Sequence, residues 1–201
     1  PLDRSHNLAR RLGVKYLHFK IEGSNPTGSF KDRQVAIAIS KALELGRCRF
    51  ATVSSGNVGN ALAAYAAHTG TSADIFVSFE KAYFAPVDRM DEPQYQSGHY
   101  LPLDGHWAWQ SIQRSAGTLT PLEDLSIRAA QSELARSEGI FEEPHGAYAM
   151  AALIAAAEEG SLDPDALTVC VLSGFGLKDM EAAREVIASF PDRQLLAIDS
   201  L

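Results

Sequence analysis

Three short loops of small and polar residues each follow a predicted strand and lead into a predicted helix. Their sequences are NPTGSFKDR at 25–33, SSGNVGN at 54–60 and SGFGLKD at 173–179. Alternating strands and helices are typical of an α/β fold with a twisted, mainly parallel sheet flanked by helices. In such a sheet the strand ends meet at one edge, where ligands bind. The pattern therefore predicts that one sheet presents all three loops together.

Hydrophobic periodicity places the elements around these loops. Strands are expected at 15–21, 50–54, 74–78, 167–172 and 195–198, and helices over 31–45, 60–68, 122–137, 146–159 and 178–189. Between about 80 and 117, prolines and glycines interrupt the pattern and no clean period survives. We expect irregular structure there, because such punctuation breaks regular elements.

Charge and composition exclude several classes of function. The net charge of −7 makes nucleic acid a poor partner, because phosphate backbones repel an acidic surface. No apolar run reaches the roughly 20 residues that span a bilayer, and no secretion signal is visible. The six histidines lack metal-ligand spacing, so no metal site is expected. A cytoplasmic protein without a membrane partner is the expectation.

The loop that carries Lys31 has the features of a nucleophilic amine site. It runs directly into a helix, whose N-terminus carries unpaired N–H groups and a partial positive charge. This field, together with burial, favours a neutral amine, which is the form that reacts with an aldehyde. In the other two loops, Asn57 offers an amide and Ser173 a hydroxyl at the same expected edge. Each loop alone is also compatible with a simpler interpretation. The first could hold a surface lysine on the first turn of a helix, the second a helix cap, and the third a flexible strand–helix turn.

The combination of NPTGSFKDR, SSGNVGNALAAYAA and LSGFGLKD resembles threonine synthase, within the tryptophan synthase β-like enzymes that use pyridoxal 5′-phosphate (PLP). The segments PLDRSHNLARRLGVKYLHFKIEG and GTLTPLEDLSIRAAQSELARSEGIFEEPHGAYAMAALIAA are also similar to that family. The matches cover about two-thirds of the chain in the family's order. The resemblance implies a PLP cofactor and a homodimer that acts on a small amino-acid substrate.

Carried over residue by residue, the resemblance implies a role for each matched position. Lys31 would form the Schiff base with PLP and later shuttle protons, and Phe30 would lie beside the cofactor ring. Asn57 would reach the 3′-oxygen of PLP, and Ser173 would partner the pyridine nitrogen.

The substrate and the remaining motif are assigned in the same way. The substrate carboxylate would be accommodated by the turn that comprises Ser54, Ser55, Gly56 and Asn57. Glu143 and Pro144 match the family's Glu-Pro motif, which implies a packing role near the cofactor.

The chain departs from the family between Val77 and Ser111, where the glycine-rich loop for the cofactor phosphate should lie. We therefore divide the chain into three parts. Residues 1–80 hold the lysine and asparagine loops of the PLP-binding domain, 81–117 are the remnant or junctions of a mostly absent region that includes a smaller domain, and 118–201 complete the PLP-binding domain. Either a natural deletion or a longer chain joined across gaps explains this pattern, and we favour the second.

The resemblance implies a PLP-dependent carbon–oxygen lyase that converts O-phosphohomoserine and water to threonine and phosphate. Another enzyme on the same scaffold, either a serine/threonine dehydratase or a β-replacement synthase, is the nearest alternative. A non-catalytic paralogue is the alternative from a different class. The absence of a visible phosphate loop favours it, whereas the retained Lys31, Asn57 and Ser173 argue against it.

Overall fold

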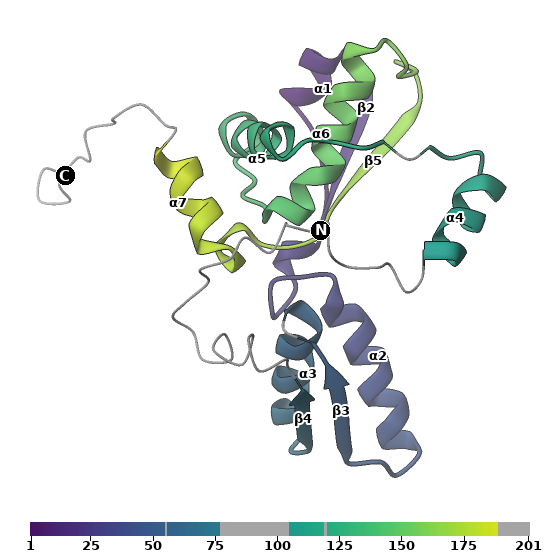
Figure 1. Ribbon diagram of the computed structural model, residues 1–201, viewed down its shortest axis with the longest axis vertical. Coiled ribbons are helices and arrows are strands. Elements are labelled where there is room, and N and C mark those ends of the chain that lie inside the picture. The colour runs from purple at the N-terminus through teal and green to yellow at the C-terminus, as the bar shows by residue number, and fades with distance from the viewer. Residues whose placement is uncertain (55, 77–104, 119, 189–201) are drawn as a thin grey trace, which may run out of the picture.

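The computed structural model describes residues 1–54, 56–76, 105–118 and 120–188, and shows helices packed around short strands (Figure 1). The strands and helices follow in this order: β1 Leu2–Arg4, α1 Leu8–Leu12, β2 Tyr16–Ile21, α2 Lys31–Glu44, β3 Arg49–Val53, α3 Asn57–His68, β4 Ser72–Phe76, α4 Gly105–Arg114, α5 Asp124–Glu138, α6 Pro144–Glu158, β5 Leu167–Leu172 and α7 Met180–Ala188. Two 3-10 turns, η1 Glu22–Ser24 and η4 Gly176–Lys178, lie in or beside the loops of interest.

The described strands form two sheets, of order β1-β2-β5 and β3-β4. The β2–β5 and β3–β4 pairs are parallel, and only the short β1 runs antiparallel to its neighbour among the described strands. The expected α/β class with mainly parallel pairing is therefore confirmed. The expectation of one sheet for all three loops is wrong for the described residues, because β3 pairs with β4 and not with β2 or β5.

Each sheet has its own hydrophobic core. In the first, β2 and β5 pack against α5 and α6, and fully buried Phe19, Met150 and Leu172 lie at the centre. In the second, α2 and α3 pack side by side, and α3 covers β3 and β4 (Figure 1). Burial of large apolar side chains is worth roughly 1.5–3 kcal/mol each, so each core stabilises its own layer.

Most expected elements appear within a few residues of their predicted bounds, and strand 167–172 is reproduced as β5. Helix α3 begins at Asn57 and not at 60, because Gly56 takes the non-helical cap position with φ −140°. Helix α4 lies in the stretch expected to be irregular. The expected strand 195–198 lies outside the described residues. In the described part of the chain, no helix is long and apolar enough to cross a membrane.

Candidate functional site

The lysine loop (residues 25–31) and the serine loop (residues 173–178) pair directly through their backbones. The Phe30 N–H donates to the Ser173 carbonyl at 3.0 Å, and the Phe175 N–H donates to the Gly28 carbonyl at 2.9 Å. These loops meet because they continue β2 and β5, which are parallel neighbours with Ile21 opposite Leu172. The structure therefore brings two of the three predicted loops to one sheet edge.

Lys31 is the first residue of α2, and its side chain is half-buried. Its Nζ lies 4.3 Å from the centroid of the Phe30 ring, so the amine and the ring are in contact. Asp32 behind it is buried and accepts hydrogen bonds from the Thr27 N–H at 3.0 Å and the Thr27 hydroxyl at 2.7 Å. A carboxylate in the first turn of a helix is favourable. Through its two hydrogen bonds from Thr27, Asp32 also fixes the loop against the helix that carries Lys31.

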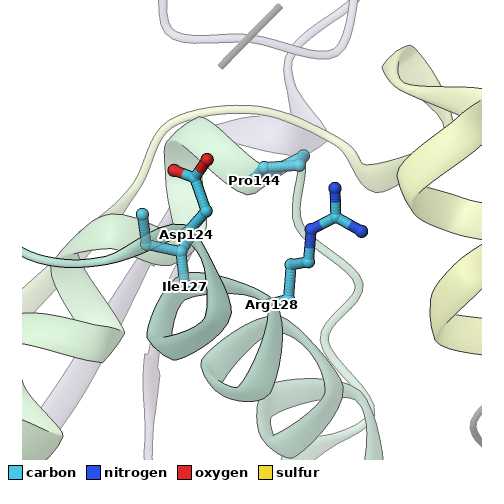
Figure 2. A pocket seen from close by; sticks show the side chains of 4 residues that line it. All are labelled: Asp124, Ile127, Arg128 and Pro144. Atoms are coloured by element: carbon cyan, nitrogen blue, oxygen red, sulfur yellow. The ribbon is translucent and has the colours of Figure 1, made fainter. Parts of the chain in front are cut away.

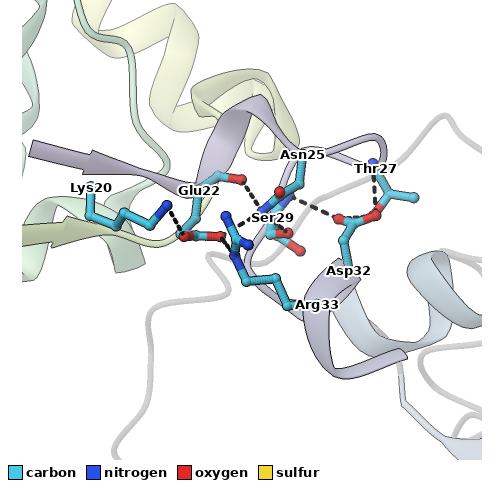
Figure 3. A network of polar contacts seen from close by, with 7 residues as sticks. All are labelled: Lys20, Glu22, Asn25, Thr27, Ser29, Asp32 and Arg33. Carbon is cyan, nitrogen blue, oxygen red and sulfur yellow. Dashed lines mark hydrogen bonds and ion pairs between the residues drawn. The ribbon is translucent and has the colours of Figure 1, made fainter. Parts of the chain in front are cut away.

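A second carboxylate anchors the other side of the lysine loop (Figure 3). Buried Glu22 accepts from the Arg33 Nε at 2.6 Å and the Asn25 Nδ2 at 2.6 Å, and its other oxygen lies 3.3 Å from the Lys20 Nζ. Burial pushes the pKa of Glu22 upward, but the hydrogen bonds from Arg33, Asn25 and Lys20 outweigh it and lower the pKa to about 2. The start of α2 is thereby tied to the end of β2.

The Glu22 network predicts a loss of stability in acid. Because the pKa of Glu22 is about 2 in the fold, against 4.5 for a free glutamate side chain, the stabilisation is present above pH 4.5 and is lost as the pH falls toward 2. Its size is on the order of 2–3 kcal/mol. Between pH 6 and 3, wild type should lose about 2 kcal/mol more unfolding free energy than Glu22→Gln, measured by urea unfolding, and the rest of the effect is lost below pH 3. The exposed Glu159→Gln serves as the control, and parallel curves for wild type and Glu22→Gln would contradict the prediction.

The asparagine loop reaches the serine loop through two consecutive glutamates that precede α6. Asn57, at the start of α3, donates from Nδ2 to the Glu143 Oε1 at 3.2 Å. The Glu143 N–H donates to the Gly174 carbonyl at 2.8 Å, and the Gly174 N–H donates to the Glu142 Oε2 at 2.9 Å. All three loops are thus connected, although the sheets that carry them are separate.

Both glutamates are buried, and burial changes their titration. It raises the pKa of Glu142 to about 8, against the opposing hydrogen bond from Gly174. It also raises the pKa of Glu143, where Lys178 and Asn57 oppose the shift. Two glycines make this packing possible: a Cβ at Gly174 would overlap the Glu143 carboxylate, and a Cβ at Gly146 would overlap that of Glu142.

The structure brings some of the site residues predicted from the sequence together and places others apart. Phe30, Lys31 and Ser173 lie together at the paired loops, and Asn57 joins them through Glu143. Ser54 and Gly56 form the turn before α3, in which the Gly56 N–H donates to the Ser54 hydroxyl at 3.2 Å. Ser55 lies outside the described residues, and Pro144 is the first residue of α6.

Sequence reasoning missed two residues and underrated a third. Glu142 was not singled out, and Glu143 was expected only to pack. Lys178 was also not singled out, although it is half-buried and its Cε lies 3.1 Å from where a Cβ on Gly28 would be. The pKa of Lys178 is lowered overall, because the effect of burial exceeds the opposing effects of Glu143 and Asp32. The burial of the two glutamates is a property of the fold, so the sequence alone carries no signal for it.

A recess near the start of α5 and α6 does not form part of this site. It is lined by Asp124, Ile127, Arg128 and Pro144 (Figure 2), and it is too tight to admit a water molecule. Arg128 also forms an ion pair with Glu185 of α7. The recess therefore has no room for a ligand, and the candidate site remains at the three loops.

The donor set at the loops fits an aromatic aldehyde cofactor such as PLP. Lys31 offers an amine, Asn57 an amide and Ser173 a hydroxyl, and each comes from a different loop. The Ser29 hydroxyl is fully buried beside them and has no hydrogen-bond partner among the described residues. A glycine-rich loop for the cofactor phosphate, expected between Val77 and Ser111, would fall largely outside the described residues.

Comparison with known families identifies the class of protein. The model of the family described as "Pyridoxal-phosphate dependent enzyme" matches residues 1–82 and 81–174. The two matched pieces meet at residues 81–82, where the sequence pattern also breaks.

Several curated relatives are threonine synthases. The one from Methanocaldococcus jannaschii is 25% identical over 306 residues, covering 91% of this chain and 76% of the relative. Those from Methanosarcina acetivorans and Mycobacterium tuberculosis are 50% and 40% identical over 70 and 107 residues, which are 35% and 53% of this chain and 17% and 29% of the relatives. The 306-residue alignment exceeds the 201 residues here, so that relative has internal segments without a counterpart in this chain.

Solved structures share the fold at low sequence identity. Cysteine synthase from Entamoeba histolytica has a TM-score of 0.61 at 13% identity, covering 96% of this chain and 89% of its own. A hydrogen sulfide-producing enzyme from Fusobacterium nucleatum has a TM-score of 0.60 at 16% identity, covering 89% and 94%. Together with the family match, they confirm the expected tryptophan synthase β-like fold.

Proposed function

Because this chain belongs to the family of pyridoxal-phosphate dependent enzymes, we propose that it is a threonine synthase-like lyase. Its substrates would be O-phosphohomoserine and water, and its products threonine and phosphate. The observation that carries the proposal is the direct pairing of the loop before Lys31 with the loop of Ser173. The identity of 40–50% to threonine synthases over 70–107 residues supports this choice within the family.

The roles of the chain's own residues follow from what they offer. Lys31 would hold the cofactor's aldehyde through its amine, and would then move protons at Cα and Cβ of the substrate. Asn57 would donate a hydrogen bond to the 3′-oxygen, and the Ser173 hydroxyl would face the ring nitrogen. When bound, PLP supplies an electron sink for the charge that develops at Cα.

The remaining residues would shield and orient. Phe30, which already lies against the Lys31 amine, would cover the reacting region from water. The turn of Ser54 and Gly56 would receive the substrate carboxylate, because backbone N–H groups at a helix N-terminus favour an anion. Phosphate would leave from Cγ, and water would add at Cβ to give threonine.

The assay that tests the proposal follows both products in one preparation. The full chain is incubated with PLP and O-phosphohomoserine, and phosphate and threonine are measured together. We expect the two products in equal amounts, at a rate in the ordinary enzyme range of about 1 s⁻¹ or more.

Other outcomes of the same assay identify the alternatives. Ammonia released from serine or threonine, without phosphate from O-phosphohomoserine, would identify a dehydratase. A replaced side chain on an activated serine in the presence of a thiol or sulfide would identify a β-replacement synthase. Failure to trap PLP on the chain with borohydride would favour a non-catalytic paralogue.

A further inference from the structure

We propose that Glu143 is a positioning residue, which orients the side-chain amide of Asn57 toward the 3′-oxygen of the cofactor. The inference rests on the proposed function, because it concerns how the chain receives PLP. It assigns Glu143 a role beyond packing, and it connects two residues that lie 86 positions apart in the sequence.

The contact itself restricts the Asn57 amide. An amide nitrogen carries two hydrogens, and one of them is donated to the Glu143 Oε1 at 3.2 Å. The flipped amide would turn its carbonyl oxygen toward the carboxylate, which is unfavourable because both groups are acceptors. The second hydrogen therefore keeps one direction and remains available as a donor to an oxygen of a ligand.

Glu143 is itself held firmly. Its side chain is buried, with 6% of the residue exposed, and its carboxylate lies against the Cα of Gly174. Its own N–H donates to the Gly174 carbonyl at 2.8 Å, and the next residue, Pro144, begins α6. Packing and a backbone hydrogen bond hold Glu143 in place. Its carboxylate can therefore orient the Asn57 amide better than a flexible surface carboxylate could.

The same contacts link the two cofactor partners to one another. Gly174 directly follows Ser173, whose carbonyl accepts the Phe30 N–H at 3.0 Å. Glu143 thus connects Asn57 of one layer with Gly174, the residue that follows Ser173, of the other. Its position provides a common reference for the 3′-oxygen and the ring nitrogen, which lie on the same rigid ring of PLP.

The test is a double-mutant cycle read by PLP affinity, measured by absorbance titration of the full chain. Glu143→Met keeps similar length without an acceptor, and Glu143→Asp keeps the charge but shortens the reach. Each is expected to raise the Kd for PLP about tenfold, the effect of losing one good hydrogen bond. Glu143→Gln retains an acceptor oxygen and should stay within about threefold of wild type.

The cycle separates positioning from a general structural role. In an Asn57→Ala background, Glu143→Met should change the Kd by less than about twofold, because the group that it positions is absent. The exposed Glu159→Gln is the control for any glutamate replacement. Equal losses with and without Asn57, or a Gln variant as weak as the Met variant, would overturn the inference.

A second measurement needs no cofactor. In the cofactor-free chain, the NMR signals of the Asn57 side-chain amide should shift in Glu143→Met and Glu143→Asp but stay unchanged in Glu159→Gln. Unchanged signals in the first two variants would overturn the inference while leaving the proposed function intact. Absence of PLP binding by wild type would instead overturn the proposed function, and the role of Glu143 toward the cofactor with it.

Discussion

Replacing Lys31 with alanine should abolish the covalent attachment of PLP. Lys31 is the residue that we assign to the cofactor's aldehyde, and it occupies the first position of α2. We expect loss of the absorbance band of lysine-bound PLP and no borohydride-trapped adduct. Phosphate release from O-phosphohomoserine should fall by at least about 10³-fold, because the same amine moves the protons.

The control for this change lies on the same helix. Lys41 is exposed near the end of α2 and pairs with Glu44 at 2.7 Å, so Lys41→Ala should leave the adduct in place. Peptide mapping of the trapped wild-type protein locates the adduct. Attachment to half-buried Lys178, which lies against the lysine loop, would show that the wrong lysine was assigned.

Local sequence was sufficient to predict what depends on neighbouring residues. The apolar run 167–172 predicted β5, and the glycine, serine, asparagine, proline and threonine residues at 23–28 predicted the loop that precedes α2. Strand 74–78 was placed two residues late, since β4 is Ser72–Phe76. Helix α4 was missed because glycines and prolines around it obscured the helical period of Gly105–Arg114.

Pairing between distant segments could not be predicted in the same way. Periodicity indicates that β3 is a strand, but it does not indicate that β3 pairs with β4 rather than with β2. The contact of Asn57 with Glu143 likewise depends on how α3 and α6 are placed in space. The resemblance to a family supplied the site residues, whereas the acidic contacts that hold them required the three-dimensional structure.

The buried acid beside the serine loop should make stability fall as the pH rises. Glu142 has a pKa of about 8 in the fold, against 4.5 for a free glutamate side chain. Above pH 4.5 the unfolded chain therefore releases a proton that the folded chain retains, which favours unfolding. Stability is unaffected by this group below pH 4.5, decreases from there to pH 8, and is then constant with respect to it.

Glu142→Gln isolates this effect, because glutamine cannot ionise and keeps an oxygen that can accept the Gly174 N–H. Relative to wild type, the variant should gain on the order of 3–4 kcal/mol of unfolding free energy between pH 5 and 8, measured by urea unfolding. The neighbouring Cys170 thiol does not ionise in the folded chain over this range, because burial raises its pKa to about 12. Glu159→Gln should run parallel to wild type. If Glu142→Gln also ran parallel, Glu142 would be ionised in the fold, and the serine loop would be held by a carboxylate rather than by a neutral acid.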